Sequence, residues 1–338
     1  MSSKAIRFSV AGINHGHIHG LIKSLVNAGG IFVDFYSKEE DLALAFAKRY
    51  PDARRVMSEK EILEDSSISL VVSAGIPSDR APLGIRAMEH GKDYLVDKPG
   101  FTTLKQLAEA RRVQKKTGRI YSVCFSERFE TRASVKAEAL VKAGAIGRVV
   151  STAGFGPHKI SIESRPAWFF KKAKYGGILA DIASHQMDQF LFYTGSTKAE
   201  VVSSSVANYK YPKYPELEDF GECMLKGDKG TGYVRVDWYT PDGLPTWGDG
   251  RLTILGTEGY IETRKYIDIA GKKGAEHLFM VDKKGVKYFD CSKLDLPFGK
   301  QLIYDIRYRT ETVMTQAHCF LASELALKAE VQAVRLHR

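Results

Sequence analysis

The chain has 338 residues, more than one hydrophobic core usually organises, so its length predicts two domains. Its 50 Lys and Arg against 40 Asp and Glu give a net charge of +10, which suits phosphorylated or carboxylated small molecules. The basic residues are scattered rather than gathered in a run, which argues against a nucleic-acid-binding protein. Four cysteines show no CxxC spacing, so neither a disulfide framework nor a zinc knuckle is expected.

Targeting signals are not expected either. The first ten residues reach a strand-like run without an apolar signal core, and no apolar run approaches membrane length. The sequence therefore predicts a cytoplasmic protein with no membrane partner.

Residues 5–125 alternate short β-rich runs with helical patterns, which predicts a doubly wound parallel sheet. Such sheets bind ligands beyond the carboxyl ends of their strands, so the loops there are the places to look for a site. Strands are expected at Ile6–Ala11, Ile31–Tyr36, Ser69–Ala74, Asp93–Val96 and Ile120–Phe125, with helices starting near His17, Glu39, Ser58, Ser78 and Thr103.

The first loop, from Gly12 to His17, partly matches the glycine-rich turn of dinucleotide-binding proteins. Asn14 replaces the second glycine of that pattern, and because Asn tolerates positive φ it is expected to keep the turn. His17 replaces the third, where it would crowd the helix against the strand. A metal site formed by His15, His17 and His19 is the alternative, but no carboxylate lies among them in sequence. A nucleotide site is preferred, no metal is expected, and an ordinary turn remains open.

The second loop, after the run ending at Tyr36, begins with Ser37 and Lys38. An acidic residue usually stands there to hold the ribose hydroxyls of NAD. Ser37 and Lys38 instead suit a 2′-phosphate, so NADP is expected to bind at least as well as NAD. A plain helix start at Ser37 is an alternative, and Asp34 could serve if the strand ends earlier.

The third and fourth loops carry Pro77 and the triplet Asp97-Lys98-Pro99. A lysine held at a strand end before proline has a fixed approach, unlike a lysine that only aids solubility. Beside a charged cofactor, Lys98 could stabilise a developing alkoxide.

The stretch Gly176–Gly195 combines a polar stripe with an apolar helical pattern. On one continuous helix Asp181, His185 and Asp188 would share a face. No Lys, Arg or Glu occurs between Ile178 and Thr194, so the stripe is expected to line an enclosed cleft rather than a wet surface. A carboxylate one turn before an imidazole orients the ring as a general base requires. An amphipathic helix with a solvated polar side is the alternative.

The second half of the chain, from about Val149, reads as successive strands without intervening helices, which implies an antiparallel sheet. A closing helix is expected over Thr310–Leu336. The strands are expected at Val149–Phe155, Glu200–Asn208, Gly221–Leu225, Thr231–Tyr239, Leu252–Leu255, His277–Val281 and Val286–Asp290.

Four motifs follow one another along the chain: the partial glycine turn, the triplet at Lys98, the sequence Glu127-Arg128-Phe129, and the pattern Gly-Gly-x-x-x-Asp-x-x-x-His-x-x-Asp from Gly176 to Asp188. In these motifs and in their order, the chain resembles the glucose–fructose oxidoreductase, inositol dehydrogenase and rhizopine catabolism (Gfo/Idh/MocA) family. The family's triplet is usually Glu-Lys-Pro, and its third loop usually reads Pro-Asn-x-x-His where this chain has Pro77-Ser78-Asp79-Arg80-Ala81.

The resemblance implies a Rossmann dinucleotide-binding domain over residues 1–122. It implies an α+β domain with a large, open, mostly antiparallel sheet over residues 123–338. One face of that sheet would close the active site and the other would join subunits into a homodimer or homotetramer.

The resemblance also assigns residues. Lys98 would contact the nicotinamide and the substrate hydroxyl, and Asp181 and His185 would complete the site with His185 as base. Arg128 and Trp168 are expected to bind substrate, Trp168 as a stacking wall for a sugar ring or, alternatively, as an ordinary hydrophobic anchor. The cofactor-binding residues expected from the four loops are Gly12, Asn14, His15, Ser37, Lys38, Pro77, Asp97 and Lys98.

The expected function is an oxidoreductase that uses NADP or NAD on a secondary alcohol or ketone of a sugar, cyclitol or derivative. A redox-neutral glycoside-cleaving enzyme that uses tightly held NAD⁺ starts with the same hydride abstraction and stays open. A dinucleotide sensor is the third possibility, although binding alone would need none of Lys98, Asp181 and His185.

Overall fold

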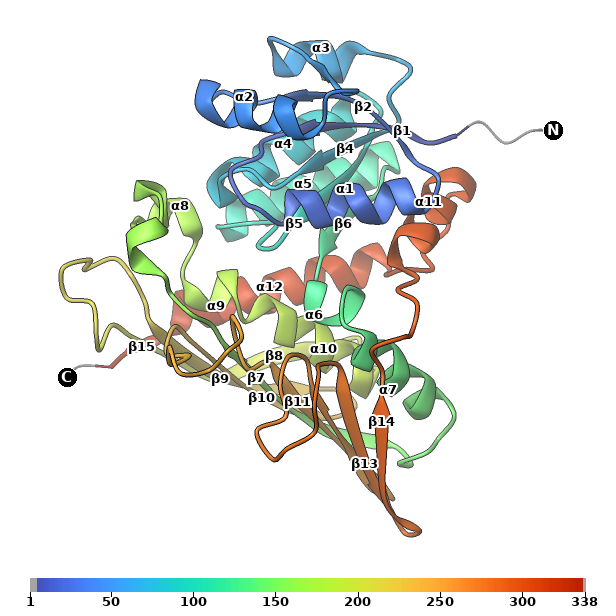
Figure 1. Cartoon of the computed structure of the whole chain (residues 1–338), viewed down its shortest axis with the longest axis vertical. Helices are drawn as coiled ribbons and strands as arrows, with labels where there is room; N and C mark the ends of the chain where they lie inside the picture. Colours follow the sequence, from blue (N-terminus) through green and yellow to red (C-terminus); the bar gives the residue numbers. More distant parts are fainter. Residues whose placement is uncertain (1–4, 337–338) are drawn as a thin grey trace. The chain divides into compact units, whose positions relative to one another are not determined.

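The computed structural model describes residues 5–336 and divides into two compact units (Figure 1). The first contains the chain up to Cys124 together with Pro297–Phe320, and the second contains Phe125–Leu296 and the chain from Leu321 onward. Among residues 5–336, no helix combines the length and the apolar character that crossing a membrane requires.

The first unit is built on a six-stranded sheet in which every neighbouring pair is parallel, in the order β3-β2-β1-β4-β5-β6. The predicted doubly wound sheet is confirmed, and its order reverses between β1 and β4, where such sheets bind ligands. Its strands are β1 Arg7–Ala11, β2 Ile31–Tyr36, β3 Arg54–Arg55, β4 Leu70–Ser73, β5 Asp93–Asp97 and β6 Tyr121–Cys124, and its helices include α1 Ile18–Asn27, α2 Glu40–Arg49, α3 Glu59–Glu64, α4 Pro77–Glu89 and α5 Leu104–Thr117.

Local signals fixed two of these helix starts. Ser58 and Glu61 form the full capping box that their spacing predicts. Thr103 accepts the backbone N–H of Gln106, but the Gln106 side chain turns to the backbone N–H of Thr102, so only half of the second box forms.

Residues 297–320 pack in the first unit, although the sequence assigned them to the second domain. The Arg309 guanidinium donates to both Asp93 carboxylate oxygens, at 2.7 and 2.9 Å, and the Gln316 side chain accepts the backbone N–H of Tyr121. These long-range contacts leave no periodic signal in the sequence. The closing helix is shorter than the predicted range Thr310–Leu336, because α12 covers only Gln316–Gln332. A separate helix that was not predicted, α11 (Phe298–Tyr308), precedes it.

The second unit holds a nine-stranded sheet in the order β14-β13-β12-β11-β7-β10-β9-β8-β15. It is mostly antiparallel, as predicted, with parallel pairs only at β10–β7 and β15–β8. Two strands, β12 and β15, were not predicted, and β15 lies within the range expected to be a closing helix. The strands are β7 Val149–Pro157, β8 Ala199–Ala207, β9 Phe220–Gly227, β10 Thr231–Asp237, β11 Arg251–Gly256, β12 Gly259–Arg264, β13 His277–Asp282, β14 Gly285–Asp290 and β15 Val334–Arg335.

The stretch predicted as one helix is two, α9 (Ile178–Asp181) and α10 (Ser184–Thr194), separated by a tight turn. Helix α10 lies on β7 and β10, and glycines on those strands let it come close. A Cβ at Gly154 would lie 2.6 Å from Cγ of Gln186. The polar residues of α10 are therefore buried rather than solvated. The remaining helices of this unit are α6 Ser126–Phe129, α7 Arg132–Lys142 and α8 Lys172–Tyr175, with 3₁₀ turns at Ile162–Ser164 and Ala167–Phe170.

Candidate functional site

The glycine turn after β1 brings two backbones together. Gly12 has φ of +83°, and a Cβ there would lie 2.9 Å from the Cα of Gly75 in the loop after β4. Only glycine fits such a close approach, the kind a pyrophosphate-binding turn requires. The site therefore fits a dinucleotide at the switch point of the sheet. Asn14 does not adopt positive φ, so the backbone conformation expected for it is wrong, although the turn forms.

Asn14 instead binds Glu39, an acidic residue that was not predicted to belong to the site. Its side-chain amide donates to the carboxylate of Glu39 at 2.9 Å, and the Ser37 hydroxyl donates to the other carboxylate oxygen at 2.9 Å. Burial opposes ionisation of Glu39, but these hydrogen bonds outweigh it and lower the pKa of the carboxyl. Lys38 and Gly12 line the same pocket as Glu39. Asp34 is paired with Arg54 of the neighbouring strand β3 and does not line this pocket.

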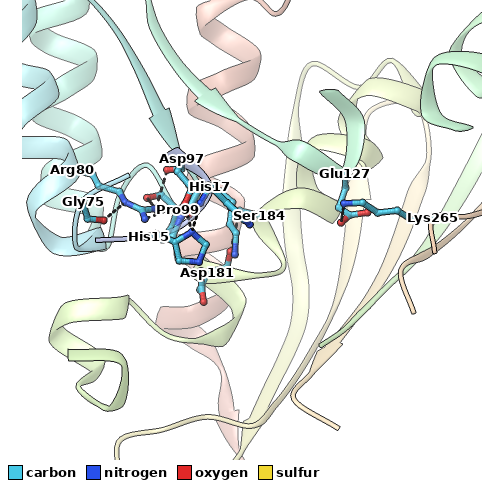
Figure 2. A network of polar contacts seen from close by, with 11 residues as sticks. His15, His17, Gly75, Arg80, Asp97, Pro99, Glu127, Asp181, Ser184 and Lys265 are labelled. Atoms are coloured by element: carbon cyan, nitrogen blue, oxygen red, sulfur yellow. Dashed lines mark hydrogen bonds and ion pairs between the residues drawn. The ribbon is translucent and has the colours of Figure 1, made fainter. Parts of the chain in front are cut away.

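Two of the three histidines in the first loop converge on Asp97 at the end of β5 (Figure 2). Nδ1 of His15 lies 3.2 Å from one carboxylate oxygen, and Nδ1 of His17 lies 2.9 Å from the other. The exposed His17 ring turns toward Asp97 and does not crowd the helix as expected. His19 lies elsewhere, against Tyr50. The carboxylate that the sequence lacked near these histidines thus comes from a distant loop.

Arg80, which is 1% exposed, joins the third and fourth loops (Figure 2). Its guanidinium donates to the backbone oxygens of Gly75 (2.7 Å), Asp97 (3.0 Å), Lys98 and Pro99 (3.3 Å). It also donates to the Asp97 carboxylate at 3.2 Å. Burial opposes ionisation of Asp97, but the nearby charges and both histidine contacts hold the pKa of that carboxyl well below its usual range.

Lys98 is therefore placed by its backbone. Its carbonyl is bound by Arg80, the peptide bond to Pro99 is cis, and the residue is 7% exposed. The hydrogen bonds from Arg80 to the backbone of Asp97, Lys98 and Pro99 thus hold the fourth loop in place. In the neighbouring third loop, Pro77 is the first residue of α4.

In the second unit, Asp181 is the last residue of α9 and His185 lies in the first turn of α10. The turn between them is closed by the His185 backbone N–H, which donates to the Ile182 carbonyl at 3.2 Å. His185 is 2% exposed and Asp181 is partly exposed. The two residues remain within one compact segment although the helix is broken.

Arg128 and Asp188 form a buried, two-pronged ion pair. The guanidinium donates to both carboxylate oxygens at 2.7 Å and lies between the rings of Phe129 and Phe192. Asp188 thus faces Arg128, and Arg128 has a partner within the protein that does not depend on a bound substrate.

Two other features lie in this unit. Glu127 pairs with Lys265, the residue that follows strand β12, with an oxygen-to-nitrogen distance of 2.8 Å (Figure 2). Trp168 lies on the 3₁₀ turn before α8, is partly exposed and touches Phe169 edge-on. A partly exposed ring is compatible with either role expected for Trp168.

Comparison with known proteins gives the family. The family model described as "Oxidoreductase family, NAD-binding Rossmann fold" matches residues 7–125, and the one described as "GFO/IDH/MocA C-terminal domain" matches residues 134–262. The chain belongs to the Gfo/Idh/MocA family. It is therefore an NAD(P)-dependent oxidoreductase, as the sequence predicted.

Individual relatives agree with this assignment. A candidate oxidoreductase from Erwinia carotovora atroseptica SCRI1043 is 43% identical, with a TM-score of 0.95 over 98% of this chain and 100% of that one. The scyllo-inositol 2-dehydrogenase (NAD(+)) of Bacillus subtilis is 27% identical over 75% of this chain and 70% of its own length. The levoglucosan dehydrogenase of Pseudarthrobacter phenanthrenivorans is 29% identical over 58% of this chain and 51% of its own length.

Proposed function

We propose that this Gfo/Idh/MocA protein transfers hydride between NAD(P) and a secondary alcohol or ketone of a sugar, cyclitol or derivative. The observation that carries the proposal is the placement of Lys98: a buried lysine at the carboxyl end of a Rossmann strand, held there by the buried Arg80. The printed names of relatives, an inositol dehydrogenase and a levoglucosan dehydrogenase, support a polyhydroxylated substrate.

We assign the chemistry to Lys98, Asp181 and His185. When bound, the nicotinamide supplies the hydride acceptor or donor. A hydroxyl that loses hydride from its carbon must also lose its proton, and His185 takes this role as general base. Asp181 orients the imidazole, and the Lys98 ammonium stabilises negative charge on the substrate oxygen. Arg128 would support the site through Asp188, and Trp168 would stack on the substrate ring.

The proposed cofactor-binding residues are those of the loops beyond the first sheet. Gly12 gives the pyrophosphate close access to the backbone, with Asn14, His15, Pro77 and Asp97 around it. Ser37 and Lys38 suit a 2′-phosphate, but the Glu39 carboxylate in the same pocket repels one and can accept from ribose hydroxyls. We therefore propose that NAD(H) is preferred over NADP(H), a reversal of the preference expected from Ser37 and Lys38 alone.

We also propose that copies of the chain associate through the second sheet. Apolar side chains on β8, β9, β11, β12 and β14 are exposed, and an exposed apolar sheet face marks an interaction surface. The side chains are Val202, Met224, Leu255, Tyr260 and Val286. Sedimentation of Val286→Lys should show smaller species than the wild type, whereas Met57→Lys, an equally exposed apolar site in the first unit, should leave the assembly unchanged.

The test of the function is a substrate screen. Inositols, aldopentoses and anhydrosugars are offered with NAD⁺ or NADP⁺, and the absorbance of the reduced nicotinamide is followed. Turnover of at least one polyol is expected, together with little cofactor retained by the purified protein, because a dehydrogenase must exchange its cofactor. Near-stoichiometric retained NAD⁺ without net reduction would favour the redox-neutral glycoside-cleaving alternative.

A further inference from the structure

The second unit contains a charge cluster that the proposed chemistry does not use. The Lys172 ammonium on α8 lies 2.5 Å from Oε1 of Glu218 and 2.6 Å from Oε1 of Glu330. Glu218 precedes β9 and Glu330 lies on α12, and their side chains are 0% and 6% exposed. Three segments far apart in the sequence therefore meet at one lysine.

Both carboxylates also bind the start of α9. The backbone N–H of Ile178 donates to Oε2 of Glu218 at 3.0 Å, and that of Leu179 donates to Oε2 of Glu330 at 3.0 Å. The first N–H groups of a helix have no partner within the helix. A helix of one turn is also too short to be stable by itself, so these two carboxylates supply what α9 lacks.

The glycine pair before α9 leaves room for the carboxylates that bind the start of this helix, an arrangement called here the α9 anchor. Gly177 has φ of +98°, and a Cβ there would lie 2.1 Å from the carboxylate carbon of Glu330. Any side chain at this position would displace Glu330 from the Leu179 N–H. The second glycine of the motif is therefore needed for the anchor as well as for the turn.

We propose that Glu218 and Glu330 are positioning residues for the oxidoreductase reaction. They hold the first turn of α9 and thereby fix Asp181, two residues beyond Leu179, with Lys172 balancing their charge. This inference rests on the role proposed above for Asp181 and His185.

The cluster has a net negative charge when fully ionised, because two carboxylates share one lysine. Burial, followed by the charge of Glu218, raises the pKa of Glu330 to about 7. The other groups that face the pair are Tyr175, whose hydroxyl accepts the Glu218 backbone N–H, and Arg335, 3.6 Å from Glu218. Since the folded pKa lies above the unfolded value, this carboxyl contributes less to stability as pH rises through about 7. Glu330→Gln keeps an acceptor for Leu179 and removes this titration.

The test compares Glu218→Ala, Glu330→Ala and Glu330→Gln with the wild type, measuring kcat, KM and NAD(H) affinity across pH. The two alanine variants should lose roughly 10- to 100-fold in kcat, since a small misplacement of a catalytic group has that effect, while NAD(H) affinity in the first unit stays unchanged. Glu330→Gln should keep most of kcat. Its stability should lack the fall that the titration of Glu330 causes in the wild type as pH rises through about 7. Lys171→Met is the control, because Lys171 forms a largely exposed pair with Glu216 one residue away from Lys172.

Amide hydrogen exchange at Ile178 and Leu179 gives a readout independent of activity. Exchange at these amides should be faster in the alanine variants than in Lys171→Met. If the wild type oxidises a sugar and the alanine variants keep its kcat while only their melting temperature falls, the positioning role is overturned. If the wild type turns over no substrate, the proposed function fails, and unchanged exchange at the two amides would separately overturn the anchor.

Discussion

The side-chain amide of Asn14 donates a hydrogen bond of 2.9 Å to the carboxylate of Glu39. This contact joins the glycine turn after β1 to the start of α2 and places a negative charge in the pocket that Ser37 and Lys38 also line. An acidic side chain in this position accepts from ribose hydroxyls and disfavours a 2′-phosphate.

Glu39→Gln should therefore shift the ratio of NADP(H) to NAD(H) affinity toward NADP(H) by about 10-fold, as removal of roughly 1.4 kcal/mol of repulsion would do. Fluorescence titration of both cofactors measures the ratio. Glu40→Gln is the matched control, because Glu40 pairs with Arg55 instead. Lys38→Ala should weaken NADP(H) selectively. A wild-type preference for NADP(H) that Glu39→Gln leaves unchanged would contradict this account.

The Arg128–Asp188 pair should be important for stability, because both side chains are buried, at 7% and 0% exposed. Arg128→Met leaves a buried carboxylate without its cation and should cost about 3–5 kcal/mol in the free energy of unfolding. Urea unfolding, followed by a probe in the second unit, measures the loss. Lys142→Met breaks the exposed pair with Glu138 on α7 and should change stability very little. Equal effects of the two substitutions would show that the buried pair has no special role.

Part of the stability that the first unit loses as pH falls should come from protonation of Asp97. Its pKa is held well below the ordinary value, so the ionised carboxylate stabilises the first unit above the unfolded pKa of about 4. That contribution is lost as pH falls through the lower folded pKa. Asp97→Asn should thus lower the melting temperature at neutral pH and reduce the further loss on acidification. Asp79→Asn, at an exposed position on α4, serves as control, and parallel acid curves for Asp97→Asn and wild type would refute the assignment.

Much of the fold could be predicted from the sequence because its signals are local. The β-rich runs from Ile6 to Phe125, interrupted by helical patterns, specify a parallel sheet, and Ser58 with Glu61 marks a helix start by spacing alone. The break at Ile182 and Ala183 could not be predicted, because the helical period of residues 178–194 continues through it.

The site was harder to predict, because its contacts join distant segments. Lys98 stood out by its place before Pro99, but nothing local shows that Arg80 binds the backbone around it. Asp97 lies 80 residues beyond His17 in the sequence. Glu39 could have been found, since it lies three residues after β2, within reach of the pocket.

If His185 acts as the base, its loss should be seen most directly in kcat of His185→Ala with a substrate identified by the screen. A fall of roughly 10²- to 10⁴-fold is predicted, with NAD(H) affinity largely kept. His277→Ala is the control, since His277 is a fully buried histidine that binds Tyr288 and Gly274 in the same unit. It should lower the melting temperature yet keep turnover per folded molecule. Near-normal kcat in His185→Ala, accompanied only by lost stability, would contradict the account.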